Sequence, residues 1–145
     1  MMQQLKLPAI ALAFAGLGAG ALAAYRWTAD PGPRCRAGTA AYSRLELLFG
    51  LGLHGGGEVS EEEWRAFIET EVTPRFPDGL TVLTALGQWR SRSGEVAKEP
   101  SRVLVIWHRR GAGGETDIEA IRQAYKTQFG QESVMRVDGA SCVSF

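Results

Sequence analysis

The side chains best suited to binding chemistry lie at the two ends of one segment, residues 75–90. Guanidinium groups hold carboxylates and other anions through paired hydrogen bonds, and aromatic rings stack on apolar molecules. Such residues are costly choices for a plain turn and hairpin. They therefore suggest a binding mouth for a small ligand, built from Arg75, Phe76, Gln88, Trp89 and Arg90.

The same residues also have a structural interpretation, and the sequence favours it. Phe76 and Trp89 would close the hydrophobic core, and Arg75 would pair with Glu71 or Asp78. Both interpretations place a tight turn at Pro77-Asp78-Gly79, because these residue types favour turns.

Two further side chains are candidates for proton transfer. His108 ends a predicted strand and could act as a general base, but no partner acid can be identified. Tyr125 lies on the apolar stripe of a predicted helix, so core packing is favoured over acid-base chemistry. His54 is distant in sequence from His108, and two separated histidines do not indicate a metal site. We predict neither a metal nor a cofactor.

The composition fits one folded domain without an excess of basic or acidic residues. The chain has 145 residues, and its 16 basic and 16 acidic side chains balance to a formal net charge of zero. Nucleic-acid-binding domains usually carry an excess of basic residues. We therefore expect no nucleic-acid partner.

The first 24 residues have the pattern of an export signal. Lys6 precedes an uncharged run at residues 7–24, and Ala21 and Ala23 fit an A-x-A cleavage rule. The alternative is an uncleaved membrane anchor, since about 18 apolar residues are the short limit for spanning a bilayer. Both interpretations place the domain outside the cytoplasm, as a periplasmic or secreted protein, and the second tethers it to the inner membrane through residues 7–24. Residues 25–41 read as a linker, and residues 42–145 as the folded domain.

The remaining chain alternates strands and helices. Period-two spacing predicts strands at residues 42–53, 80–86 and 133–137, and an apolar run predicts a buried strand at residues 102–109. Residues 88–90 would continue the second strand after a bulge at Gly87. Two capping boxes, Ser60 with Glu63 and Thr116 with Glu119, predict the starts of helices that end before Pro74 and at Gly130.

This order, β-α-β-β-α-β, predicts an α+β, ferredoxin-like split βαβ sandwich. Its antiparallel four-stranded sheet would have the order 4-1-3-2, with both helices on one face. The start of the first strand would then lie near the end of the fourth, which favours a disulfide between Cys35 and Cys142.

The other face of that sheet stays open to water, a ligand or a second subunit. Gly50 and Gly52 on this face could admit a ligand or a partner's backbone, although a bulge or a bend is the favoured interpretation. Because two such faces can pack together, a homodimer is also an expectation.

Several separated motifs carry a family resemblance. Residues 58–90, 100–108 and 121–138 and the terminal Cys142-Val143-Ser144-Phe145 resemble the bacterial domain-of-unknown-function family 3574, in the right order and from about Ser43 to Phe145. The resemblance implies an exported or lipid-anchored bacterial protein. This chain lacks a lipid-box cysteine, which argues against lipid anchoring.

Taken together, the residues favour an exported cell-envelope domain that binds a small ligand or a protein partner without catalysis. The alternative is a small cofactor-free enzyme, tautomerase- or monooxygenase-like, with a pocket on a dimeric sheet. His108, Arg75 and Arg90 would be its candidate residues.

Overall fold

The computed structural model describes residues 33–90, 93–109 and 114–145. Seven elements follow one another along this part of the chain: β1 (Ala40–Gly50), α1 (Glu61–Phe67), the π-helical segment η1 (Ile68–Val72), β2 (Thr81–Arg90), β3 (Val96–Arg109), α2 (Glu115–Phe129) and β4 (Met135–Val143). The predicted export or anchor segment, residues 1–24, lies outside the described residues.

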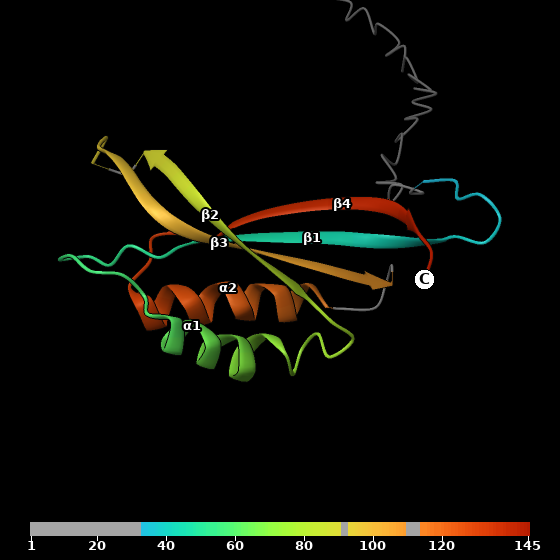
Figure 1. Ribbon diagram of the computed structural model, residues 1–145, viewed down its shortest axis with the longest axis horizontal. Helices are drawn as coiled ribbons and strands as arrows, with labels where there is room; N and C mark the ends of the chain where they lie inside the picture. The colour runs from blue at the N-terminus through green and yellow to red at the C-terminus, as the bar shows by residue number, and fades with distance from the viewer. Residues whose placement is uncertain (1–32, 91–92, 110–113) are drawn as a thin grey trace, which may run out of the picture. The chain divides into compact units, whose positions relative to one another are not determined.

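The strands form one antiparallel sheet with the order β2-β3-β1-β4. Leu45 of β1 pairs with Ile106 of β3 on one side and with Asp138 of β4 on the other. Both helices lie against the same face of the sheet (Figure 1). This topology confirms the ferredoxin-like α+β sandwich and the central position of the third strand.

The core lies between the sheet and the helices. Alternate residues of β1 are buried, as the period-two pattern predicts, and the stripe of α2 faces them. Phe49 stands at the centre of an aromatic cluster, with its ring centroid 4.7 Å from that of Tyr125, 5.2 Å from Trp64 and 5.9 Å from Phe67. These edge-to-face contacts join both helices to the sheet.

The first helix begins where its capping box predicts. The Glu63 backbone N–H donates to the Ser60 hydroxyl at 3.2 Å, and the Ser60 N–H donates to the Glu63 carboxylate at 2.9 Å. The Ser60 backbone N–H and the Ser60 hydroxyl both donate to the Glu63 carboxylate, and these two hydrogen bonds lower the pKa of Glu63 because they favour its charged form. From Ile68 the helix widens to π-type bonding and then ends before Pro74.

The second helix begins differently from the prediction. Its N-cap is Gly114, which provides no side-chain hydrogen bond, so the expected box of Thr116 and Glu119 is wrong. Glu119 instead pairs with Arg122 at 2.7 Å and with Arg136 of β4 at 3.3 Å. The helix ends, as predicted, at Gly130 in the left-handed conformation.

Each of the four strand predictions also needs a correction. The first strand ends at Gly50 rather than at residue 53, and the fourth runs from Met135 to Val143 rather than over residues 133–137. No bulge forms at Gly87, because β2 pairs with β3 in unbroken register from Thr81 to Arg90. The third strand starts at Val96, six residues before the predicted residue 102.

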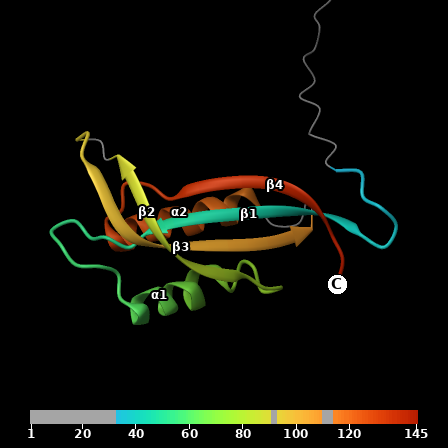
Figure 2. The same ribbon diagram turned by 45° about the horizontal axis from the view of Figure 1, so that its top comes forward.

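The extra length of β3 makes a two-stranded projection, which we call the arm. It consists of Leu86–Arg90 paired with Val96–Pro100, beyond Ser101, where the pairing of β3 with β1 ends. The arm curves away from the helices, toward the open side of the sheet (Figures 1 and 2). It gives the open face a side wall.

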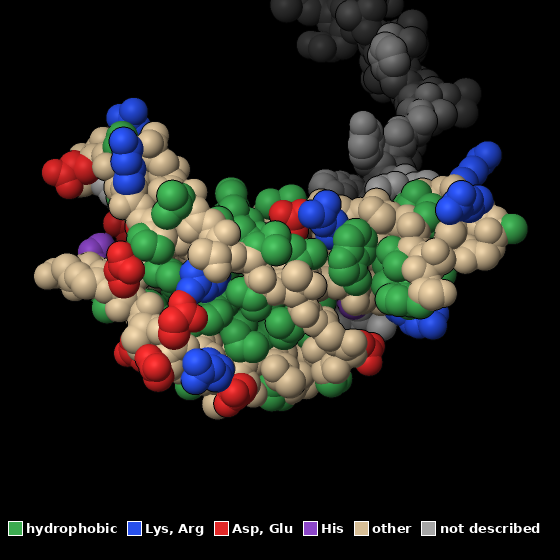
Figure 3. Space-filling view, viewed as in Figure 1, with side chains coloured by type: hydrophobic (Ala, Val, Ile, Leu, Met, Phe, Trp, Pro, Cys, Tyr) green, Lys and Arg blue, Asp and Glu red, His purple; other side chains and the backbone are tan. Residues whose placement is uncertain are grey.

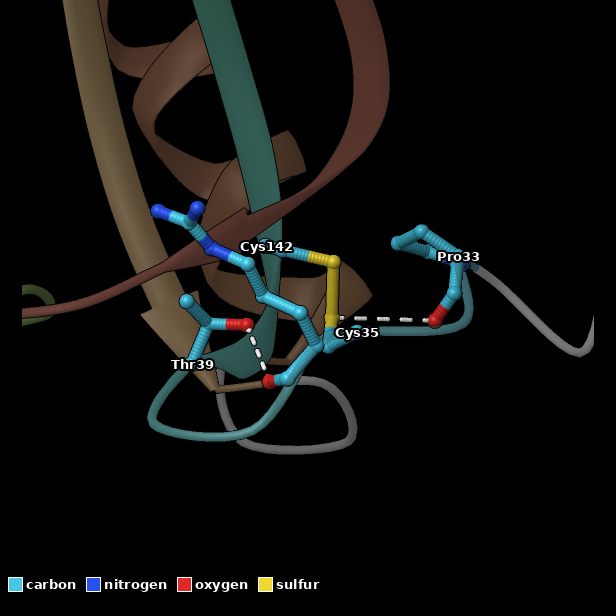
Figure 4. The surroundings of a disulfide bond; sticks show 5 residues. Pro33, Cys35, Thr39 and Cys142 are labelled. Carbon is cyan, nitrogen blue, oxygen red and sulfur yellow. Dashed lines mark hydrogen bonds between the residues drawn. A yellow bond between two sulfur atoms is a disulfide. The ribbon is translucent and has the colours of Figure 1, made fainter.

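The predicted disulfide between Cys35 and Cys142 is present. It joins the segment before β1 to the end of β4, with a Cα–Cα distance of 5.4 Å and a sequence separation of 107 residues. Nearby, the Thr39 hydroxyl donates to the Arg36 carbonyl at 2.8 Å and closes the turn that enters β1 (Figure 4). The bridge therefore fixes the two chain ends of the described domain to each other.

None of the helices in the described ranges is long and apolar enough to cross a membrane.

Candidate functional site

The structure separates the two ends of the predicted binding mouth. Arg75 and Phe76 precede β2, whereas Gln88, Trp89 and Arg90 end it. A ten-residue strand spans about 30 Å. One small ligand therefore cannot touch both groups.

The Arg75 end is largely occupied by internal contacts. Arg75 donates to the Glu71 carboxylate at 3.1 Å and to the Glu71 carbonyl at 2.5 Å, so it has one of the two partners considered for it. Phe76 is buried, and its ring centroid lies 5.9 Å from that of His108. The hollow beside these residues measures about 100 Å³, which is room for roughly three water molecules.

Tyr125 lies in the core rather than in a pocket. Its ring is fully buried in the aromatic cluster, and its hydroxyl donates to the Gly50 carbonyl at 2.8 Å. Burial raises the pKa of Tyr125, and the nearby Glu99 carboxylate raises it further. The hydroxyl therefore stays protonated and acts as a hydrogen-bond donor that holds the end of β1.

Strand alternation also divides the group at the end of β2. Trp89 shares the open face of the sheet with Glu99 of β3, while Gln88 and Arg90 point to the opposite face. Arg90 donates to the Gly94 carbonyl across the hairpin at 3.3 Å. Of these three consecutive residues, Trp89 alone has its side chain on the open face.

Glu99 is the residue that the sequence did not single out. Its carboxylate reaches across from the arm to β1 and accepts the Gly52 backbone N–H at 2.7 Å. A Cβ atom on Gly50 would lie 2.4 Å from the Glu99 Oε1 atom, so the missing side chain leaves the space that the carboxylate fills. Gly50 and Gly52 thus admit a glutamate of the same chain, rather than marking a bulge.

Glu99, Gly50 and Trp89 line a cleft of about 290 Å³, which we call the Glu99 cleft. Its residues come from all four strands and from the loop after α2. They include Leu48, Gly50, Trp89, Glu99, Ser101 and Met135. Hydrophobic side chains lie along the open surface of the sheet beside the arm (Figure 3). The cleft thus combines an apolar floor, one aromatic ring and one carboxylate.

The base of the cleft is fixed from the helix side. Gln131, just after α2, donates to the Gly52 carbonyl at 2.6 Å, next to the Tyr125 contact with Gly50. The Glu99 carboxylate of the arm accepts the Gly52 N–H at the same place. Three hydrogen bonds from distant parts of the chain therefore set the end of β1 and position the carboxylate.

One polar atom near the cleft is without a protein partner. The Trp89 Nε1 atom is buried and has no hydrogen-bond acceptor among the described residues. Buried N–H groups without an acceptor are rare, because each costs roughly 1 to 3 kcal/mol. No group of three or more possible metal ligands occurs among the residues that the structure describes.

Comparison with known families identifies the family of this domain. The family described as "Protein of unknown function (DUF3574)" matches residues 44–145, well over half of the chain and all of the sheet-and-helix body after the start of β1. This chain belongs to the DUF3574 family. The match confirms the resemblance found in the sequence motifs. The Glu99 cleft lies wholly within the part of the chain that DUF3574 covers.

Solved structures with a similar fold include a phage SAM lyase in complex with S-methyl-5'-thioadenosine. It has 16% sequence identity and a TM-score of 0.54, over 78% of the DUF3574 chain and 95% of its own. CutA from Synechococcus elongatus has 14% sequence identity and a TM-score of 0.44. The match covers 71% of the DUF3574 chain and 81% of the CutA chain. At such identities the likeness concerns the fold alone. The search of curated proteins finds no match for this DUF3574 chain.

Proposed function

We propose that this DUF3574 domain binds a small ligand in the Glu99 cleft, outside the cytoplasm and without catalysis. The observation that carries the proposal is the Glu99 carboxylate beside the Trp89 ring in one cleft. Its volume of about 290 Å³ is close to the lower end of the range typical of ligand pockets. A molecule the size of a substituted aromatic ring would fit.

The lining supports a ligand with a flat apolar body. Trp89 provides a ring on which such a body can stack, and Leu48 and Met135 provide an apolar floor. Met135 is 56% exposed, so covering it would remove apolar surface from water. An acceptor atom on the ligand could also satisfy the buried Trp89 Nε1–H.

The polar groups of the cleft support binding rather than bond chemistry. The Ser101 hydroxyl donates to the Glu99 backbone carbonyl at 3.5 Å, and no base among the described residues is bonded to it. The candidate residues of the alternative, a cofactor-free enzyme, do not meet in one site. His108 and Arg75 line the same small hollow, whereas Arg90 lies at the far end of β2. The cleft geometry therefore favours a binding protein.

Two features support a location outside the cytoplasm. The disulfide between Cys35 and Cys142 is of a kind that persists in oxidising compartments. Residues 1–24 have the sequence pattern of a signal peptide or an anchor. The homodimer expected from the open sheet stays a prediction, as does an envelope protein as partner.

A thermal-shift screen tests the binding proposal. The panel should include aromatic amines and S-methyl-5'-thioadenosine, the molecule named in the phage SAM lyase complex. A compound at about ten times its Kd should stabilise the domain by roughly 1.4 kcal/mol, which is several degrees in Tm. We expect this shift in the wild type and its loss in Trp89→Ala, because the stacking surface is gone.

Val96→Ala is the matched control for this screen. Val96 lies on the same arm, is 50% exposed and pairs with Arg90, so it belongs to the opposite face. This variant should keep the full ligand shift. A panel without any stabilising compound, or equal shifts in Trp89→Ala and Val96→Ala, would contradict binding in the Glu99 cleft.

A further inference from the structure

We infer that the ligand carries a positively charged nitrogen group, which the Glu99 carboxylate binds while the apolar body stacks on Trp89. This inference rests on the proposed function, and it names the chemical class of the ligand: an organic cation with an aromatic or apolar body. Observations on Glu99, on the neighbouring carboxylates, on the end of α2 and on the Trp89 ring lead to it.

The Glu99 carboxylate has unused hydrogen-bonding capacity. Within the described part of the chain it accepts one hydrogen bond, from the Gly52 N–H at 2.7 Å, and it is half-buried in the cleft. An ionised carboxylate can accept roughly four hydrogen bonds. A ligand N–H group within reach would therefore find free acceptor positions.

No arginine or lysine of the described residues forms an ion pair with Glu99. Arg102, three residues further along β3, points to the helix face and pairs with Glu61. Arg44 pairs with Glu46 at 2.8 Å. A partly buried carboxylate without a cationic partner is costly, because it loses hydration that nothing replaces. A cationic ligand would offset that cost.

The surroundings add negative potential. A hollow of about 380 Å³ adjoins the cleft and shares Trp89 and Glu99 with it. Besides Glu99, its lining includes Glu95, Lys98 and His54, together with Glu132, which has an interaction of its own. Clefts lined mainly by one sign of charge concentrate ions of the opposite sign.

The α2 helix contributes in the same direction. Its C-terminal end, at Phe129, is held at the cleft by Gln131, which donates to the Gly52 carbonyl at 2.6 Å. The C-terminus of a helix carries a partial negative charge from its unpaired carbonyl groups. The face of Trp89 also favours cations, through the negative potential above an indole ring.

A charge-matched ligand series tests the inference. Tryptamine, tryptophol and indole-3-propionate share an indole ring and a two-carbon linker but end in an ammonium, a hydroxyl and a carboxylate group. Their Kd values are measured by NMR titration of the disulfide-bonded domain. We expect tryptamine to bind at least about tenfold more tightly than tryptophol, and indole-3-propionate more weakly than both, because hydrogen bonds to a charged group are the stronger ones.

Glu99→Gln separates charge from shape. The amide oxygen of the glutamine can still accept the Gly52 N–H, so the turn at the end of β1 should keep its structure. The variant should lose about tenfold in tryptamine affinity and change tryptophol affinity less than about twofold. Glu62→Gln, an exposed site in the first turn of α1, is the control and should change neither.

Salt dependence gives a second measurement that needs no variant. Raising the salt concentration from about 50 mM to about 500 mM should weaken the binding of tryptamine, because salt screens the charged contact. The affinity for tryptophol, which is uncharged, should stay nearly the same. Equal affinities of the three indoles in the wild type, with binding lost in Trp89→Ala, would overturn the charge inference and leave the binding proposal intact. If none of the three indoles binds and no compound of the thermal-shift panel stabilises the domain, both the charge inference and the binding proposal are overturned.

Discussion

Replacing Cys35 and Cys142 together by serine is expected to lower the free energy of unfolding by about 4 to 5 kcal/mol. The bridge closes a loop with a sequence separation of 107 residues, and it therefore removes much of the freedom of the unfolded chain. For a domain of this size, such a loss corresponds to a fall in Tm of roughly 20 °C. β1 and β4 also lose the covalent link at the end of their ladder.

Urea unfolding of the oxidised wild type and of the double variant measures this effect. Reduction of the wild type should reproduce the curve of the variant, and the same reductant should leave the variant unchanged. A difference below about 1 kcal/mol would mean that the unfolded chain does not gain the expected freedom. The bridge would then have no large role in stability.

Phe49→Ala is expected to cost about 3 to 5 kcal/mol. Phe49 is fully buried, and its ring contacts Trp64 and Phe67 of α1 and Tyr125 of α2, so its removal leaves a cavity between both helices and the sheet. The neighbouring rings are themselves close-packed and cannot collapse into the space. Part of the stabilisation by edge-to-face contacts is lost as well.

Leu83→Ala is the control for this core variant. Leu83 lies on β2 with half of its surface exposed, so the same kind of truncation should cost less than about 1 kcal/mol. Denaturant unfolding with an unchanged m-value should give both differences. A cost for Phe49→Ala no larger than that for Leu83→Ala would show that the aromatic cluster does not hold the helices to the sheet.

The fold could be predicted because its signals are local. Period-two spacing marked β1, the Ser60 capping box marked the start of α1, and Gly130 marked the end of α2. The Thr116 box failed because a tertiary contact decided it, since Glu119 pairs with Arg136 of β4. The bulge expected at Gly87 failed for another reason, since backbone pairing with β3 keeps β2 in register through this glycine.

The site could be predicted only in part, because it depends on pairing between distant segments. Residues 96–100 lack a strand-like apolar pattern, and they are extended because β2 pairs with them. Glu99 was missed for this reason, and close approach to β1 at Gly50 and Gly52 was the less favoured of their two interpretations. Trp89 was found, and Gln88 also lines the cleft, but strand alternation turns the side chains of Gln88 and Arg90 to the opposite face. The length of β2 separated it from Arg75 and Phe76.

One NMR titration decides where a ligand binds. Tryptamine is added to the ¹⁵N-labelled, disulfide-bonded wild type, and the shift of every assigned N–H signal is followed. The largest changes should occur at the Gly50, Gly52 and Glu99 amides and at the Trp89 indole N–H, because all four lie in or beside the Glu99 cleft. Largest changes at Phe76 and His108, about 30 Å away along β2, would contradict the assignment of the site.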